Sequence, residues 1–158
     1  MSTEVDRKAR LLIVDDEPIN IDILSSILAE DYELRAATTG KQAIAISKKQ
    51  LPDLILLDMV MPEMDGVAVC EALKADESTS GIPIIFVTSM GDSENEERGL
   101  QAGAVDYISK PVSPPIVKAR VKIHIQNVLS LRFLEGLLSS QTTSEEVKSQ
   151  AESLLVFI

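Results

Sequence analysis

The sequence predicts an α/β fold, a doubly wound, five-stranded parallel sheet with helices on both faces and a helical C-terminal extension. Two observations predict it. Between about residue 10 and residue 110, short apolar runs alternate with amphipathic stretches, which is the pattern of βαβ units. Several runs, such as the one between Asp53 and Asp58, are apolar on both faces, as strands are when helices cover both sides of a parallel sheet.

Each expected element has its own local signal. Pro18 is a favourable first residue of a helix, and the residues after it repeat an apolar pattern at helical spacing. Pro83 is tolerated at the start of a strand. The expected strands are 11–14, 33–37, 53–58, 84–87 and 105–109. The helices expected between them are 18–30, 40–49, 66–75 and 92–101.

After Pro111 the pattern is helical. A long helix is expected to open at 113–115, and its inward row advances by alternating steps of four and three residues through Val117, Val121, His124, Val128 and Leu131. A polar break at 139–144 follows, where Thr143 and Glu146 form a capping-box pattern for one more amphipathic helix. We therefore expect three parts: an N-terminal segment at 1–9, a domain at 10–125 and a helical tail at 126–158.

The composition excludes several classes of function. The 158 residues include 25 acidic and 15 basic side chains, a formal net charge of −10, whereas a general nucleic-acid or anionic-membrane binder needs a basic face. The single cysteine, Cys70, and single histidine, His124, are too few for a zinc site within one chain. No signal-peptide pattern opens the chain, and no apolar run is long enough to span a bilayer. We therefore expect a cytoplasmic protein that neither contacts nucleic acid directly nor inserts into a membrane.

Polar side chains gather where the expected strands end. Asp15 and Asp16 follow the first strand, Asp58 ends the third, Thr88 follows the fourth and Lys110 follows the fifth. In an open parallel sheet, ligands bind outside the carboxyl ends of the strands. Each residue alone is an ordinary turn or cap residue, but their occurrence at four strand ends together predicts one site.

The residue types at these strand ends predict metal and phosphoryl chemistry. Three carboxylates in one crevice cannot all stay ionised without compensation, and a cation with oxygen ligands, Mg²⁺ or Mn²⁺, supplies it. One carboxylate can then act as a nucleophile toward a phosphoryl group. An ammonium group and a hydroxyl can stabilise the phosphoryl oxygens.

With these motifs in place, the chain resembles the receiver domains of two-component response regulators, of the chemotaxis-protein type. The motifs are LIVDDE at 12–17, PDLILLD at 52–58, MPEMDG at 61–66, VTS at 87–89 and DYISKP at 106–111. The resemblance covers about residues 10 to 125. It implies a flavodoxin-like sheet with strand order 2-1-3-4-5.

The resemblance also implies roles for the acidic residues. Asp58 is expected to accept a phosphoryl group from the phosphohistidine of a histidine kinase or a histidine phosphotransfer protein. Asp16 and Asp58 are expected to bind Mg²⁺ directly, together with the backbone carbonyl of Val60. Asp15 is expected to act mostly through a water molecule.

Three further residues are expected to respond to phosphorylation: Lys110 and Thr88 as catalytic residues, and Thr88 and Tyr107 as the switch. Lys110 would pair with Asp58 and then with the phosphoryl group, and Thr88 would move toward the phosphate. Tyr107 would rotate inward to fill the vacated space. The Lys110-Pro111 peptide is expected to be cis. A phosphoryl group adds about −1.5 to −2 charges near pH 7, which biases an element with two packings, here the face built from 92–101, 105–109 and the long helix.

Two positions beside the expected site are apolar. Val60 and Met90 stand where other receivers often carry polar residues, and neither side chain can orient a hydrolytic water. We therefore hypothesise that the phosphoaspartate is long-lived, for minutes or more. The alternative is that both side chains merely pack.

The output is open at this point. One reading is a stand-alone receiver that contacts a downstream effector protein through its long helix and tail, or forms a homodimer through them. The other is a receiver cut from a longer regulator, because the segment from Pro111 to Val117 and Ala119-Arg120-Val121 are similar to receivers joined to cyclic-di-GMP-turnover domains. A constitutive binding module of the same fold is a third reading. None of them is an enzyme acting on external substrates.

Overall fold

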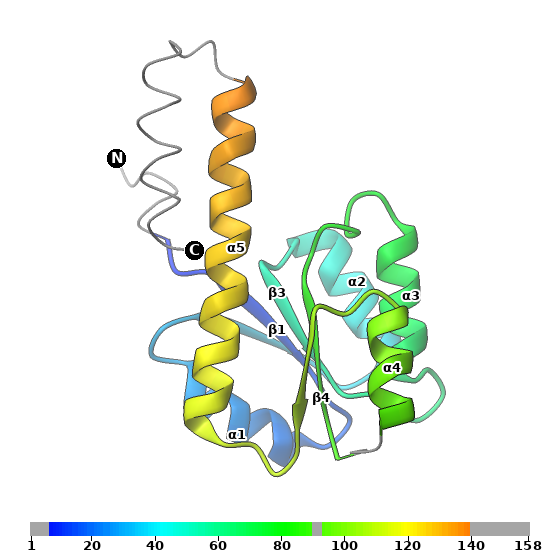
Figure 1. The fold of residues 1–158 in the computed structure, drawn as a ribbon. Coiled ribbons are helices and arrows are strands. Elements are labelled where there is room, and N and C mark those ends of the chain that lie inside the picture. The colour runs from blue at the N-terminus through cyan, green and yellow to red at the C-terminus, as the bar shows by residue number, and fades with distance from the viewer. Residues whose placement is uncertain (1–6, 90–92, 140–158) are drawn as a thin grey trace.

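The computed structural model describes residues 7–89 and 93–139, which contain a five-stranded sheet (Figure 1). Its strands are β1 (Arg10–Val14), β2 (Glu33–Ala37), β3 (Leu54–Leu57), β4 (Ile84–Thr88) and β5 (Asp106–Ser109). All neighbouring strands are parallel, and they lie in the order β2-β1-β3-β4-β5. The predicted fold class and strand order are confirmed.

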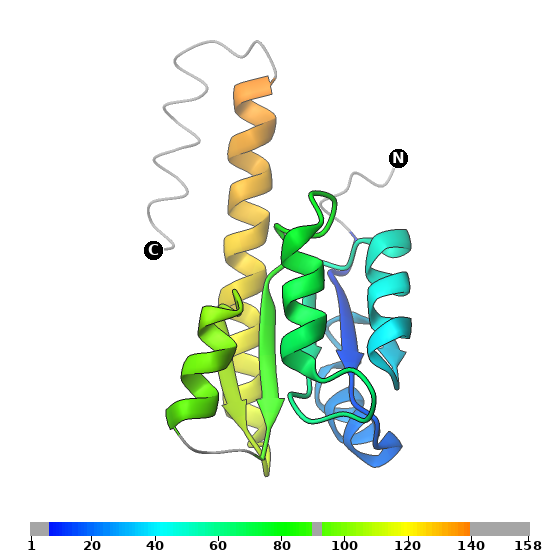
Figure 2. The same ribbon diagram turned by 90° about the vertical axis from the view of Figure 1, so that its right-hand side faces the viewer.

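Helices cover both faces of this sheet. They are α1 (Pro18–Leu28), α2 (Gly40–Gln50), α3 (Gly66–Ala75), α4 (Ser93–Gln101) and α5 (Pro114–Ser139). Leu24 and Leu28 of α1 share one buried cluster with Val117 and Val121 of α5, whereas α2 and α3 contribute to the cluster on the other face. Figure 2 shows α3 and α4 in front of the sheet and α5 behind it.

The central strands are apolar on both sides, as predicted. Alternate residues of β1 and β3 enter opposite clusters: Leu12 and Ile55 face the α2 and α3 side, while Leu11 and Leu54 face the α1 and α5 side. All four residues of β3 are buried. This double burial fixes the register of each strand, because a slip by one residue would exchange the two faces.

The element boundaries differ from the predictions by at most two residues. The predicted strand 53–58 shortens to Leu54–Leu57, so that an aspartate stands immediately outside each end of β3. Helix α2 runs one residue further than expected, and Leu51 ends it in the left-handed conformation with φ 47°. Helix α1 ends at Leu28, two residues early.

Helix α5 is 26 residues long and passes position 125 without a break. In the predicted inward row, Val117 and Val121 are buried, but Leu131 is 61% exposed, because α5 continues past the edge of the sheet (Figure 1). The predicted polar break from residue 140 onward and the final helix lie outside the described residues. Within the described ranges, no helix is long and apolar enough to cross a membrane.

Candidate functional site

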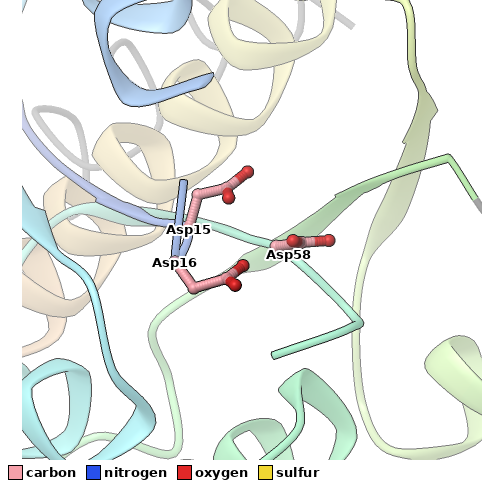
Figure 3. A group of neighbouring side chains, drawn as sticks. All are labelled: Asp15, Asp16 and Asp58. Atoms are coloured by element: carbon pink, nitrogen blue, oxygen red, sulfur yellow. The ribbon is translucent and has the colours of Figure 1, made fainter. Parts of the chain in front are cut away.

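The sheet brings three aspartates together at its carboxyl edge. β1 and β3 are neighbours with Val14 opposite Leu57, so the residues that follow each strand are also neighbours. The backbone N–H of Asp58 donates to the carbonyl of Val14 (2.9 Å). Carboxylate oxygens of Asp15, Asp16 and Asp58 lie within 4.8 Å of one another (Figure 3). The predicted convergence of the three carboxylates is present in the fold.

Lys110 reaches this acidic group from the end of β5. Its Nζ lies 2.7 Å from Oδ2 of Asp15 and 3.7 Å from Oδ2 of Asp58. The Lys110-Pro111 peptide is cis, and the backbone N–H of Lys110 donates to the carbonyl of Thr88 (3.0 Å). The expected partner of Lys110 was Asp58, but the shorter contact is with Asp15.

Asp15 has both carboxylate oxygens engaged. Oδ1 accepts the backbone N–H of Glu17 (2.9 Å), and Oδ2 accepts the ammonium of Lys110 (2.7 Å). The side chain is 3% exposed. Both oxygens of Asp15 thus have partners within the protein.

Burial makes Asp58 harder to ionise. It raises the pKa of the Asp58 carboxyl above its usual value, and the charges of Asp15 and Asp16 raise it further. Lys110 and the N–H of Val60 act in the opposite direction without reversing the shift. A cation held by these oxygens would favour the ionised, nucleophilic form of Asp58, and an all-oxygen donor set suits Mg²⁺ or Mn²⁺.

Gly66 holds the loop after Asp58 against the site. A Cβ atom at this position would lie 2.2 Å from the backbone oxygen of Asp58, which no side chain can satisfy. Asp65 caps α3 by accepting the N–H of Ala68 (2.8 Å), and the N–H of Gly66 donates to Met59 (2.9 Å). The sequence placed Gly66 in a motif and at a helix start, but only the fold explains why a glycine is needed there.

An open crevice of about 610 Å³ lies over the acidic group. Val60, which is 53% exposed, contributes to its wall. Sequence reasoning missed Asn20 and Glu17, which line the crevice and lie 3.4 Å apart from Nδ2 to Oε2. The full lining is Asp16, Glu17, Asn20, Asp58, Val60, Met61, Pro62, Ser89 and Lys110.

The two expected switch residues lie apart from this lining. Thr88 is fully buried at the end of β4, and the next residue, Ser89, contributes to the crevice wall instead. Tyr107 is half-buried and packs against the core on the α2 and α3 face. Met90 lies outside the described residues.

A second charged cluster joins β5 to α5 beside Tyr107. Asp106 accepts Arg120 Nη1 at Oδ1 (2.8 Å) and pairs with His124 Nε2 at Oδ2 (2.9 Å). Arg120 Nη1 also donates to the carbonyl of Tyr107 (2.6 Å). Burial alone would raise the pKa of Asp106, but the bonds from His124 and the N–H of Tyr107 and the charge of Arg120 lower it overall. His124 is thus a partner of a carboxylate, whereas the sequence suggested a packed histidine on an apolar row.

Comparison with known proteins agrees with this geometry. The sequence profile described as "Response regulator receiver domain" matches residues 11–122. The chain belongs to the response regulator receiver family. Receivers of this family bind Mg²⁺ at an acidic pocket, and in this chain Asp15, Asp16 and Asp58 form an acidic cluster. A receiver is not an enzyme with an external substrate, since the chemistry in which it takes part is its own phosphorylation.

Several response regulators are similar to this receiver. It is 46% identical over 134 residues to a Vibrio cholerae protein named "Probable cyclic di-GMP phosphodiesterase", covering 85% of this chain and 30% of the relative. It is 42% identical over 115 residues to the response regulator PleD of Caulobacter vibrioides, covering 72% and 25%. The chain therefore spans about a quarter to a third of the length of these two relatives.

Solved structures of receivers superpose on the chain. The chemotaxis protein CheY4 of Vibrio cholerae has a TM-score of 0.70 and 28% identity, covering 73% of this chain and 97% of CheY4. The receiver domain of a Pseudomonas aeruginosa sensor histidine kinase has a TM-score of 0.70 and 28% identity, covering 75% and 98%. That structure has a magnesium ion coordinated in its active site cleft.

Proposed function

We propose that this receiver is a phosphorylation-driven switch in which Asp58 accepts a phosphoryl group from a phosphohistidine. One observation carries the proposal: three carboxylates and the ammonium of Lys110 meet at one open crevice, with Asp58 buried between them. A carboxylate oxygen of Asp58 forms a bond to phosphorus as the phosphorus–nitrogen bond of phosphohistidine breaks. The departing imidazole nitrogen keeps that electron pair and takes up a proton.

A bound Mg²⁺, or Mn²⁺ in its place, would neutralise the crevice and the incoming phosphoryl oxygens. Asp16 and Asp58 are the residues proposed to hold it directly, with the backbone carbonyl of Val60, while Asp15 acts through water. The engagement of both Asp15 oxygens by Glu17 and Lys110 supports this division.

The charge on phosphorylated Asp58 would then recruit Lys110 and Thr88. Lys110 already lies 3.7 Å from Asp58, so a small displacement from Asp15 brings it to a phosphoryl oxygen. Movement of Thr88 would open space in the core near Tyr107, which rotates inward. Because α4, β5 and α5 carry or contact these residues, they form the proposed output face.

A groove beside the crevice supports a protein partner as phosphodonor. It has a volume of about 420 Å³ between α1 and the segment after β5, and it is lined largely by apolar side chains. Ile19 and Ile23 of α1 are 65% and 44% exposed. We propose that a helix of a histidine kinase or phosphotransfer protein docks here and presents its phosphohistidine to Asp58.

Two outputs remain in the proposal. The similarity to the Vibrio cholerae protein extends over 134 residues, beyond the receiver profile, which favours a receiver within a longer regulator that has a cyclic-di-GMP-turnover or other output domain. A stand-alone receiver would instead contact an effector protein or a second copy through α5 and the tail. A cytoplasmic location, where histidine kinases expose their phosphohistidine, is part of both versions.

The test is phosphorylation of the purified chain. With Mg²⁺ and acetyl phosphate, intact-protein mass spectrometry is expected to show one added phosphoryl group in the wild type and in Asp22→Asn, an exposed control. Asp58→Asn is expected to show none, and chelation of the metal is expected to abolish the addition. If the wild type gains no phosphoryl group and binds no beryllofluoride, the chain is a constitutive binding module instead.

A further inference from the structure

Helix α5 has basic side chains that pair with carboxylates of the sheet region, both in the part that covers the sheet and beyond it. Arg120, His124 and Arg132 belong to one row of residues spaced four apart, in which Val128 is the apolar member. Residues four apart lie on nearly the same face of a helix. Arg120 and His124 meet Asp106, as described above. Arg132 meets a different carboxylate, that of Asp53.

Asp53 is held rigidly by the start of β1. Its backbone N–H donates to the carbonyl of Arg10 (2.8 Å), and its Oδ2 accepts the N–H of Arg10 (2.7 Å). Its Oδ1 is fully buried, and no donor of the described residues makes a well-angled hydrogen bond to it. The guanidinium of Arg132 lies against that oxygen at 2.5 Å. An ion pair with Arg132 is therefore what compensates the charge at Oδ1.

The two carboxylates that hold α5 share a position in the sheet. Asp53 immediately precedes β3, and Asp106 is the first residue of β5. The carboxyl ends of the same two strands are followed by Asp58 and Lys110. Each of these strands thus joins a residue of the phosphorylation site, at one end, to an anchor of α5 at the other.

We propose that Arg132 is a positioning residue: its ion pair with Asp53 fastens the C-terminal half of α5 to the amino end of the strand that leads to Asp58. The segment from Gln126 to Ser139, here called the arm, is then part of the receiver body and not a free linker. Whatever contacts or follows the arm is held in a fixed orientation to the phosphorylation site. A second part of the inference rests on the proposed function: phosphorylation at Asp58 alters the arm through this anchor.

The surroundings of Arg132 offer the arm little apolar contact beside the ion pair. A cavity of about 330 Å³ separates the arm from the loops at the amino edge of the sheet. Val128 and Leu131 line this cavity opposite Pro52 and Ile82, but Leu131 stays 61% exposed. Apolar packing along the arm is therefore incomplete. Because removing one partner of a buried ion pair is strongly destabilising, the contact of Arg132 with Asp53 contributes more to the attachment of the arm than these apolar contacts do.

Hydrogen–deuterium exchange of the intact chain tests the fastening. In Arg132→Gln, amides of the arm are expected to exchange about tenfold faster, the loss of one charged interaction, while amides of β4 keep their protection. Arg132→Lys is expected to retain most of the protection. Lys122→Gln, the same change at an exposed position of α5, is expected to leave the arm unchanged. Asp53→Asn keeps an acceptor for Arg10, and adding it to Arg132→Gln is expected to cause no further increase.

Unchanged arm protection in Arg132→Gln overturns the inference, as does an equal loss in Lys122→Gln. The second part is tested with Mg²⁺ and beryllofluoride on the same proteins. Slower exchange of the peptide containing Asp58, together with altered exchange of the arm in the wild type but not in Arg132→Gln, supports coupling. Protection at Asp58 with an unchanged arm overturns the coupling alone. No protection at Asp58 overturns the proposed function and the coupling, while the measurement without beryllofluoride still decides the fastening.

Discussion

The ammonium of Lys110 lies 2.7 Å from a carboxylate oxygen of Asp15 and 3.7 Å from one of Asp58, so in the unphosphorylated protein Lys110 pairs most closely with Asp15. At this distance a positive charge and a divalent cation compete for the same carboxylates. Lys110 must leave Asp15, at least in part, before it can follow a phosphoryl group on Asp58. The charge of Lys110 would therefore oppose the binding of a cation to these carboxylates.

This competition predicts the effect of Lys110→Met on metal affinity. Because the substitution removes a competing charge, we expect the Kd for Mg²⁺ to fall by about fivefold, while phosphorylation by acetyl phosphate slows. Isothermal titration calorimetry measures the first effect and mass spectrometry the second. Lys122→Met, at an exposed position of α5, is expected to change neither. Weaker Mg²⁺ binding by Lys110→Met would contradict the competition.

The raised pKa of Asp58 predicts a pH-dependent stability. The folded protein holds more protons than the unfolded chain between the usual aspartate pKa and the raised one, so stability falls as the pH rises through that interval. Asp58→Asn removes this cost. With metal chelated, we expect the variant to be more stable than the wild type at pH 7, and the difference to vanish as the pH falls below the usual aspartate pKa of about 4.

Urea unfolding followed by circular dichroism at both pH values measures this difference. Asp22→Asn provides the matched control, because Asp22 is exposed and its amide should leave the stability nearly unchanged at either pH. A variant Asp58→Asn that is less stable than the wild type at pH 7 would contradict the prediction.

The close approach of the backbone at Gly66 predicts that adding one methyl group there strongly destabilises the fold. Gly66→Ala would place Cβ 2.2 Å from the backbone oxygen of Asp58, so we expect a loss of about 2–3 kcal/mol in the free energy of unfolding and weaker Mg²⁺ binding. Gly81→Ala is the control, since a Cβ there meets nothing within 4 Å. Its effect is expected to stay within about 0.5 kcal/mol. Equal losses for the two variants would argue against the contact.

The exposed side chain of Val60 predicts a slow loss of the phosphoryl group. It lines the crevice but has no polar atom with which to orient an attacking water, so we expect a phosphoaspartate lifetime of minutes or more. Val60→Gln is expected to shorten it severalfold, as followed by mass spectrometry after the phosphodonor is removed. Ile19→Gln, at an exposed site on α1, is expected to leave it unchanged. A wild-type lifetime of a few seconds that Val60→Gln does not alter would contradict the hypothesis.

Sequence reasoning was sufficient for the sheet and for the convergence of the acidic residues. Strand β3 is recognisable because all its residues are apolar, and its neighbours follow from motifs at the strand ends. The positions of Asp15, Asp16 and Asp58 then need no side-chain detail, because backbone pairing between β1 and β3 already makes them adjacent.

Apart from the pairing of Lys110 with Asp58, which the resemblance implied, the ion pairs were not predictable in the same way. Lys110, Arg120 and Arg132 have long side chains with several staggered rotamers at each bond, and their partners depend on the final placement of β5 and α5. The contacts of Arg120 and His124 with Asp106 had one available signal, a four-residue spacing of basic residues along a helix. No sequence signal indicated the role of Asp53, because an aspartate before a strand is usually an ordinary turn residue.

Because α5 runs unbroken through 26 residues, its length fixes both the distance and the direction of its far end relative to the sheet. Each residue of an α-helix advances by about 1.5 Å and turns by about 100°. Inserting a single residue within α5 after Arg132 would therefore rotate the helical segment behind it by roughly a quarter turn without disturbing Asp58 or its crevice. A series of such insertions would separate outputs that depend on facing direction from those that need only proximity.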